Sequence, residues 1–112
     1  MRPLQHSLVN PYATLLLEQL TAHIAFIGCN GIDATGGVTN RNVAEAEIKR
    51  AMVRASRRTV VVADGTKLGE VEVARVCPVG EIDLLVTDAS ADPDVLAELA
   101  VAGLAVDVVG AP

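Results

Sequence analysis

The stretch that most constrains the fold is residues 60–69, in which three valines lead through an alanine into an aspartate and a Gly-Thr-Lys-Leu-Gly turn. A β-branched run without polar alternation is typical of a strand buried on both faces, as in parallel sheets covered by helices. Asp64 ends this strand and Lys67 follows three residues later. Open α/β sheets bind ligands at that end of their strands. A carboxylate that accepts hydroxyls beside an ammonium that holds phosphate suits a phosphorylated sugar.

This pair also fits a turn cap beside a solvated charge, so a second polar segment is needed to favour the ligand site. Residues 28–40 follow another apolar run, at 24–27, and contain four glycines. The segment is too long and too polar for a simple connection, and loops of this kind are often functional. The alternative is that its glycines only provide positive φ angles in turns.

Length and charge narrow the class of protein. The 112 residues make one domain, and 51% hydrophobic residues with only 2% aromatic ones predict a core of Val, Ala, Leu and Ile. The net charge of -5 argues against this segment gripping DNA phosphates. Four arginines cluster, and a solvated helix flank with glutamate neighbours is the interpretation we favour for them. They are Arg50, Arg54, Arg57 and Arg58.

Cysteine and histidine spacing gives no sign of a metal or cofactor site. Cys29 and Cys77 lie far apart outside any CxxC pattern, and His6 and His23 are not spaced as a metal pair. We expect reduced thiols in a cytoplasmic protein. No run approaches the ~18 apolar residues of a membrane span, and the first residues lack the features of a signal peptide.

Capping signals and periodicity predict the remaining elements. Asn10 followed by Pro11 begins a helix that ends at about Leu20, and Asp92 followed by Pro93 begins a second that closes at Gly103. Residues 24–27, 82–88 and 105–109 are predicted strands, and residues 70–79 a short helix or an irregular segment. Asp88 would share the sheet edge of Asp64 if the strands are parallel. The alternation of strands and helices predicts a layered α/β fold.

A third helix is predicted from Asn42, whose capping box includes Glu45, to about Ser56. Glu45 and Lys49 are spaced for a favourable i, i+4 ion pair. Glu47 lies near the boundary between core and solvent, where it either turns toward the ligand crevice or pairs with Arg50. The residues expected to be buried are Ala44, Ile48, Ala51, Met52 and Ala55 on this helix, and Val95, Leu96, Leu99 and Ala102 on the helix after Asp92.

The order of these motifs resembles the C-terminal sensor domain of DeoR-type (glycerol-3-phosphate regulator-like) bacterial transcription regulators. The resemblance spans about residues 8–109. It rests on Asn-Pro before a helix, Gly-Cys-Asn-Gly-Ile after a strand, Gly-Gly-Val-Thr, Glu-Ala-Glu-Ile-Lys-Arg-Ala-Met, Val-Val-Ala-Asp-Gly-Thr-Lys-Leu-Gly and Asp-Leu-Leu-Val-Thr-Asp.

The resemblance implies a three-layer Rossmann-like fold with helices on both faces of the sheet, related to ribose-5-phosphate isomerase and the coenzyme A transferases. It implies a phosphorylated sugar or polyol as effector, a homo-oligomer, no membrane partner and DNA contact through a separate helix-turn-helix domain. Residues 1–112 would then be a single, partial sensor domain. The ligand-binding positions carried over are Gly28, Asn30 and Gly31 in one loop, Gly36, Gly37 and Thr39 in the second, Glu47 on the helix, and Asp64 and Lys67.

Two departures from the family pattern and two rival functions accompany this expectation. The family usually has Asp in place of Asn30 and Gly in place of Asn10, so a charge beside the ligand is lost. A related sugar-phosphate isomerase would use Glu47 as its base, but the Asn30 amide cannot take up a proton at neutral pH. A structural oligomerisation domain that binds no ligand is the other alternative.

Overall fold

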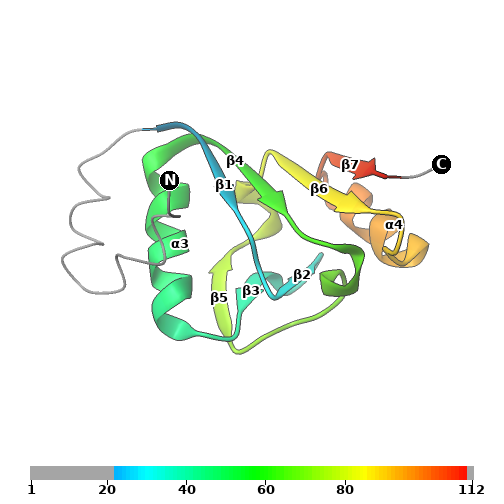
Figure 1. Ribbon diagram of the computed structural model, residues 1–112, viewed down its shortest axis with the longest axis horizontal. Helices are drawn as coiled ribbons and strands as arrows, with labels where there is room; N and C mark the ends of the chain where they lie inside the picture. The colour runs from blue at the N-terminus through cyan, green and yellow to red at the C-terminus, as the bar shows by residue number, and fades with distance from the viewer. Residues whose placement is uncertain (1–21, 111–112) are drawn as a thin grey trace.

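The computed structural model describes residues 22–110, so the predicted helix at 11–20 lies outside the described residues (Figure 1). The elements, in chain order, are β1 (Ala22–Ile27), β2 (Gly31–Asp33), β3 (Gly37–Asn40), α3 (Val43–Ala55), β4 (Ser56–Val62), the 3-10 turn η1 (Gly65–Lys67), β5 (Ala74–Cys77), the 3-10 turn η2 (Val79–Glu81), β6 (Leu84–Asp88), α4 (Pro93–Val101) and β7 (Val106–Val109). Neither of these two helices is long and apolar enough to cross a membrane.

Strands β1, β4, β6 and β7 form one sheet in that order, and every neighbouring pair is parallel. The valine run lies in β4, between β1 and β6, and Val61 is fully buried. The predicted α/β class, the central position of the valine strand and the parallel arrangement are therefore confirmed, whereas burial on both faces is not, because Val62 is 50% exposed. Because all four strands run the same way, their carboxyl ends lie along one edge.

The two faces of the parallel sheet differ in what covers them. Ile27, Val61 and Leu85 point to one face and share a core cluster with Val53 of α3 and Leu99 of α4. Alternate residues of the same strands point to the other face, where large apolar side chains remain exposed. These are Ile24, Phe26, Val62 and Val109, with exposed fractions of 44%, 63%, 50% and 46%. Both described helices lie on the first face, and helical cover on the second stays a prediction.

A second sheet, β2-β3-β5, is antiparallel and occupies two segments where no strand was predicted. The interpretation of residues 28–40 as one long loop is wrong, because they fold into a hairpin whose Ile32 and Val38 are fully buried. Residues 70–79 contain β5 and begin η2. Strands of three or four residues are too short to show a periodicity in the sequence.

Asn42 caps α3 as predicted, but the Glu45 carboxylate accepts from Asn40 Nδ2 and not from the Asn42 N–H, so only half of the predicted capping box forms. The buried side of the helix is also broader than predicted. Asn42 Oδ1 accepts a 2.9 Å hydrogen bond from the Glu45 backbone N–H. Of the five residues expected inside, Ile48 and Ala51 are buried, Met52 and Ala55 are half-buried and Ala44 is exposed. The helix packs in two directions, because Ala46, Lys49 and Val53 are buried on a second side that faces β3 and β5.

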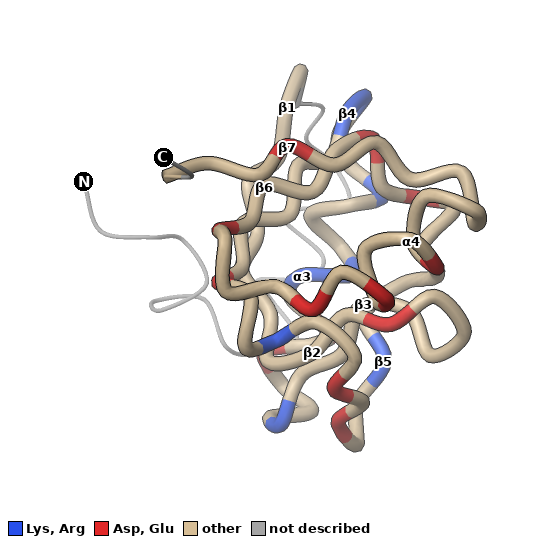
Figure 2. Tube along the Cα trace, turned by 90° about the vertical axis from the view of Figure 1, so that its right-hand side faces the viewer, with Lys and Arg blue, Asp and Glu red and all other residues tan. Residues whose placement is uncertain are grey.

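The four clustered arginines do not share one solvated helix flank, which corrects the sequence interpretation. Arg57 and Arg58 belong to β4, while Arg50 is half-buried and donates from Nη2 to the carbonyl of Arg75. Figure 2 shows basic positions near both β4 and α3, and others near β2 and β5. Helix α3 ends at Ala55, before the predicted Ser56, so the last two arginines pass into the strand.

Helix α4 begins at its predicted cap, and the predicted glycine follows its end, although the helix itself is shorter than predicted. Asp92 Oδ1 accepts a 2.8 Å hydrogen bond from the Asp94 N–H, and Gly103 follows the helix with a φ of +93°. Leu99 is fully buried, whereas Ala102, which was expected inside, is exposed. The helix ends at Val101, so Ala102 is its C-terminal cap and not part of the apolar side.

Candidate functional site

The carboxyl edge of the parallel sheet brings together three predicted positions from separate strands. Gly28 follows β1, Asp64 follows β4 with one residue between, and Asp88 ends β6. Because β4 lies between β1 and β6, Asp64 stands in the middle of this edge. A cavity of about 240 Å³ opens here, lined by Val62, Ala63, Asp64, Val86, Thr87, Asp88 and Val109. Lys67 and the glycine loops do not line it.

Asp64 and Lys67 belong to a single tight turn, in which the Lys67 backbone N–H donates to the Asp64 carbonyl at 3.1 Å. Asp64 Oδ1 accepts from the hydroxyl of Thr66 and, at 3.0 Å, from its backbone N–H. The hydroxyl bond and then the N–H bond hold the pKa of Asp64 below its usual value. Asp64 is exposed and Lys67 half-buried. The cap role weighed for Asp64 is thus present, while its Oδ2 has no protein donor within residues 22–110.

Asp88 ties the Asp64 turn to the loop before α4. Its Oδ1 accepts from the Gly65 N–H at 3.1 Å, the Ser90 N–H at 2.9 Å and the Ser90 hydroxyl at 2.5 Å. The hydrogen bonds from Ser90, followed by the one from Gly65, lower the pKa of Asp88. Asp88 lies on the predicted edge, and its contacts position the turn that carries Lys67.

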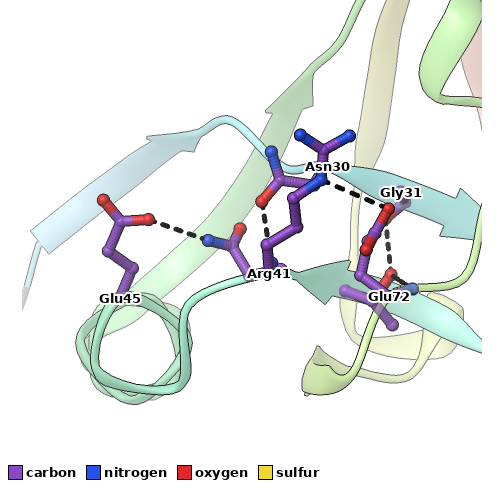
Figure 3. Close-up of polar contacts among 7 residues, drawn as sticks. Asn30, Gly31, Arg41, Glu45 and Glu72 are labelled. Atoms are coloured by element: carbon purple, nitrogen blue, oxygen red, sulfur yellow. Dashed lines mark hydrogen bonds and ion pairs between the residues drawn. The ribbon is translucent and has the colours of Figure 1, made fainter.

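Asn30 and Thr39 organise the base of the β2–β3 hairpin. Asn30 Oδ1 accepts from the Arg41 N–H at 2.8 Å (Figure 3), and the Asn30 N–H donates to the Thr39 carbonyl at 3.1 Å. The Thr39 hydroxyl, which is buried, accepts from the Glu72 N–H at 2.9 Å. Arg41 and Glu72 form an ion pair of 3.5 Å. These contacts hold the hairpin against the segment that follows Lys67.

The four glycines of the hairpin region differ in why glycine is present. A β-carbon at Gly31 would stand 2.3 Å from the Glu70 carbonyl oxygen, and one at Gly37, whose φ is +77°, would stand 2.5 Å from that of Cys77. A β-carbon at Gly36 would stand 2.9 Å from Cγ2 of Val71. Backbone geometry and close packing explain these three. At Gly28 a β-carbon would make only an ordinary 3.8 Å contact, so packing does not require glycine there.

The Gly36–Gly37 turn lies across β2 from Lys67. Ile32 bridges to Leu68 on one side and pairs with Val38 on the other. Leu68, next to Lys67, and Val38, next to Gly37, are therefore two strand spacings apart, a distance of roughly 10 Å. Glu47, the predicted helix carboxylate, is exposed on α3 and takes no part in the hydrogen bonds described above.

Lys49 was not among the predicted site residues, but the structure buries it close to the loop after β1. Its side chain is only 8% exposed, and its Nζ donates to Asn40 Oδ1 at 2.9 Å. Burial lowers the pKa of Lys49. Burial also raises the pKa of the nearby Cys29 thiol to about 11, against the opposing effects of Lys49 and Lys67. Two ammonium groups therefore act on the loop after β1. No local pattern marked Lys49 for burial, because the second buried side of α3, which also contains Ala46, is covered by β3 and β5.

Comparison with known proteins gives a consistent set of relatives. The family profile described as "DeoR C terminal sensor domain" matches residues 1–89. The chain is similar to the HTH-type transcriptional regulator GlpR of Haloferax volcanii, with 36% identity over 89% of this chain and 39% of that protein. It is also similar to the HTH-type transcriptional regulator GolR of Listeria innocua (30%, covering 83% and 37%) and to the L-fucose operon activator of Haemophilus influenzae (29%, covering 71% and 32%). The chain spans well under half the length of each.

Proposed function

We propose, from the premise that this chain belongs to the DeoR C-terminal sensor domain family, that it binds a small phosphorylated sugar or polyol as the effector of a transcriptional regulator. The observation that carries the proposal is the turn after β4, which presents Asp64 and Lys67 together at the carboxyl edge of the parallel sheet. That edge is where open α/β sheets bind ligands.

The two side chains suit the two parts of such a ligand. Lys67 is half-buried and makes no ion pair within residues 22–110, so its ammonium is available to a phosphate. Hydrogen bonds from Thr66 to Oδ1 lower the pKa of the exposed Asp64 carboxylate, and its Oδ2 remains available to accept a hydroxyl. Gly28 supports the proposal further, because a ligand could approach the backbone where no side chain projects.

The remaining predicted positions would contribute to the proposed site less directly than Asp64 and Lys67. Asn30, Gly31 and Thr39 would shape the wall opposite Lys67, since their contacts hold the hairpin against the segment after η1. Gly36 and Gly37 would act through the hairpin turn, and Glu47 would reach a ligand only from the solvent side of α3. Lys49 would add positive potential beneath the loop after β1.

The proposed activity is binding without catalysis. An effector that favours one arrangement of subunits would change the spacing of attached DNA-binding domains, because a ligand shifts an equilibrium by its differential affinity for the two states. Isomerisation would need a carboxylate base within reach of the substrate carbons. Glu47, the candidate base, is exposed on α3. Turnover of ribose 5-phosphate that depends on Glu47 would overturn this part of the proposal.

Homo-oligomerisation is the second part of the proposal. The second face of the parallel sheet exposes Ile24, Phe26, Val62 and Val109, and exposed apolar patches on sheets commonly mark protein interfaces. The edge of β1 has no strand partner within residues 22–110. A second copy of the chain, packed on this face, is the partner we propose.

A thermal-shift screen with sugar phosphates tests the binding site. A specific ligand at ~100 times its dissociation constant should add about 2.7 kcal/mol to the free energy of unfolding. Lys67→Ala should abolish that shift. Arg58→Ala, which also removes one positive charge but from an exposed position on β4, should retain it. If no sugar phosphate shifts the parent protein, a purely structural domain becomes the better description. If Lys67→Ala and the parent respond equally, Lys67 is not the anchor.

A further inference from the structure

A second cavity, of about 280 Å³, lies on α3 and β5 and shares no lining residue with the Asp64–Lys67 turn. Its charged wall consists of Arg50 and Arg54 from α3, Arg75 from β5 and Glu81 from η2. Val53 and Pro78 are among the apolar residues that complete it. Three of the chain's nine basic residues thus surround one cavity in a protein of net charge -5.

Cys77 also lines this cavity, and three of the charged side chains around it affect the pKa of its thiol. Burial is the main cause that raises the pKa of the Cys77 thiol to about 12, Glu81 raises it further, and Arg50 and Arg75 lower it. These three side chains therefore lie close enough to act on a single atom. Three guanidinium groups against one carboxylate leave an excess of positive charge, and like charges held together favour the binding of an anion.

Two of the guanidinium groups are held in place before any ligand binds. Arg75 donates from Nε to the Gly36 carbonyl at 3.1 Å and from Nη2 to the Thr35 carbonyl at 3.2 Å. Arg50 donates from Nη2 to the Arg75 carbonyl, which fixes its direction along the cavity wall. Donors oriented in advance lose little conformational entropy when an anion arrives.

Arg54, on the next turn of α3, is the third arginine that lines the cavity. Residues four apart lie on the same side of a helix, so Arg54 stands one turn beyond Arg50 at the cavity. Arg54 is exposed and makes no hydrogen bond or ion pair within residues 22–110. Its planar fork of donors matches a phosphate or carboxylate group.

We propose that this cavity binds a small dianion, a phosphate ester or a dicarboxylate, as a second ligand site separate from the Asp64–Lys67 turn. Its volume is near the lower end of the range for small-molecule pockets, which restricts the ligand to a few heavy atoms beyond the charged group. A bound dianion would join α3 to the β2–β3 turn, because Arg75 contacts both. The second site would thus stabilise the antiparallel sheet.

A titration of the 112-residue chain by two-dimensional NMR, with inorganic phosphate and malonate as separate probes at constant ionic strength, tests this site. Saturable shifts are expected at the backbone amides of Val76, Cys77 and Glu81. Arg54→Ala should weaken the affinity about tenfold, because hydrogen bonds between charged groups contribute at least that factor. Glu81→Gln should tighten binding, and a gain of affinity cannot come from misfolding.

Two controls separate this site from diffuse charge and from the proposed effector site. Arg58→Ala, which removes an exposed arginine of β4 that does not line the cavity, should change the affinity less than about twofold, as expected for a charge screened by solvent. Lys67→Ala should leave the shifts around Cys77 unchanged whether or not the effector proposal holds. Equal losses in Arg54→Ala and Arg58→Ala, loss of these shifts in Lys67→Ala, or the absence of saturation with both probes would each overturn the second site.

Discussion

Lys49 Nζ donates a 2.9 Å hydrogen bond to Asn40 Oδ1, and Asn40 Nδ2 in turn donates to Glu45 Oε2 at 3.1 Å. An uncharged amide therefore stands between the ammonium and the carboxylate that the i, i+4 spacing predicted to pair directly. Asn40 is 1% exposed, and both ends of its amide are used. The arrangement holds a buried positive charge beneath the loop after β1.

The first prediction concerns this relay. Asn40→Ala should lower the free energy of unfolding by about 1–3 kcal/mol, because it leaves a buried ammonium without its acceptor. In a Lys49→Met background the same substitution should cost less, since no charge then needs an acceptor. Urea denaturation of the four proteins gives the coupling energy. Additive effects of the two substitutions would show that Asn40 does not stabilise the Lys49 charge.

The second prediction is a loss of stability in mild alkali caused by Cys29. Its folded pKa is raised from 9.0 to about 11, so the unfolded thiol loses its proton first as the pH rises. The stabilisation is complete below pH 9 and falls toward pH 11 by about 1.4 kcal/mol per pH unit. Lys49 has the opposite effect on stability. Its folded pKa is lowered, so below its unfolded pKa of 10.5 the folded state loses the proton first, and this group makes the protein more stable as the pH rises.

Removal of the thiol isolates its share of that pH dependence. Cys29→Ala should give a flatter dependence of the free energy of unfolding between pH 9 and 11 than the parent protein. Cys77, whose pKa burial raises to about 12, remains in both proteins and its contribution cancels in the comparison. Identical pH profiles for the parent and Cys29→Ala would mean that the Cys29 thiol is not desolvated in the folded state.

The third prediction follows from the close approach of the Asp64 turn to the loop before α4. A β-carbon at Gly65 would stand 2.1 Å from the Ala91 backbone nitrogen, so one of the two segments must move. Gly65→Ala should cost about 1–3 kcal/mol by overpacking. Gly80→Ala, whose β-carbon would meet nothing within 4 Å, should be close to neutral. Equal melting temperatures for the two variants would contradict this packing.

Local sequence signals were sufficient for the parallel sheet and its carboxyl edge. The Val61 run marks a central strand because β-branched residues without polar alternation suit a position covered by neighbours on both sides. Asp64 follows β4 after one residue and Asp88 is the last residue of β6, so the parallel arrangement alone places both carboxylates on one edge. Asn42 and Asp92 cap their helices through contacts within three residues, which sequence analysis can identify.

The second sheet and the buried Lys49 depend on contacts between distant segments. Val38 of β3 pairs with Cys77 of β5, and the sequence of neither short strand indicates a partner so far along the chain. Because β3 and β5 lie against α3, a second side of the helix is buried and Lys49 passes inside with it. The structural contact of Thr39 could not be predicted for the same reason, because its hydroxyl accepts from the backbone N–H of Glu72, which is 33 residues away in the sequence.

The last prediction addresses the open face of the parallel sheet. Phe26 is 63% exposed and stands beside Val60 of β4 in the sheet register. If two copies of the chain pack on this face, Phe26→Ser should shift the population toward monomer at a given concentration, because the largest exposed apolar side chain of the patch is lost. Sedimentation velocity over a range of concentrations measures the shift. Val101→Ser, which removes an 89% exposed apolar side chain from α4, should leave the assembly unchanged. An unaltered oligomer in Phe26→Ser would place the subunit contact on another surface.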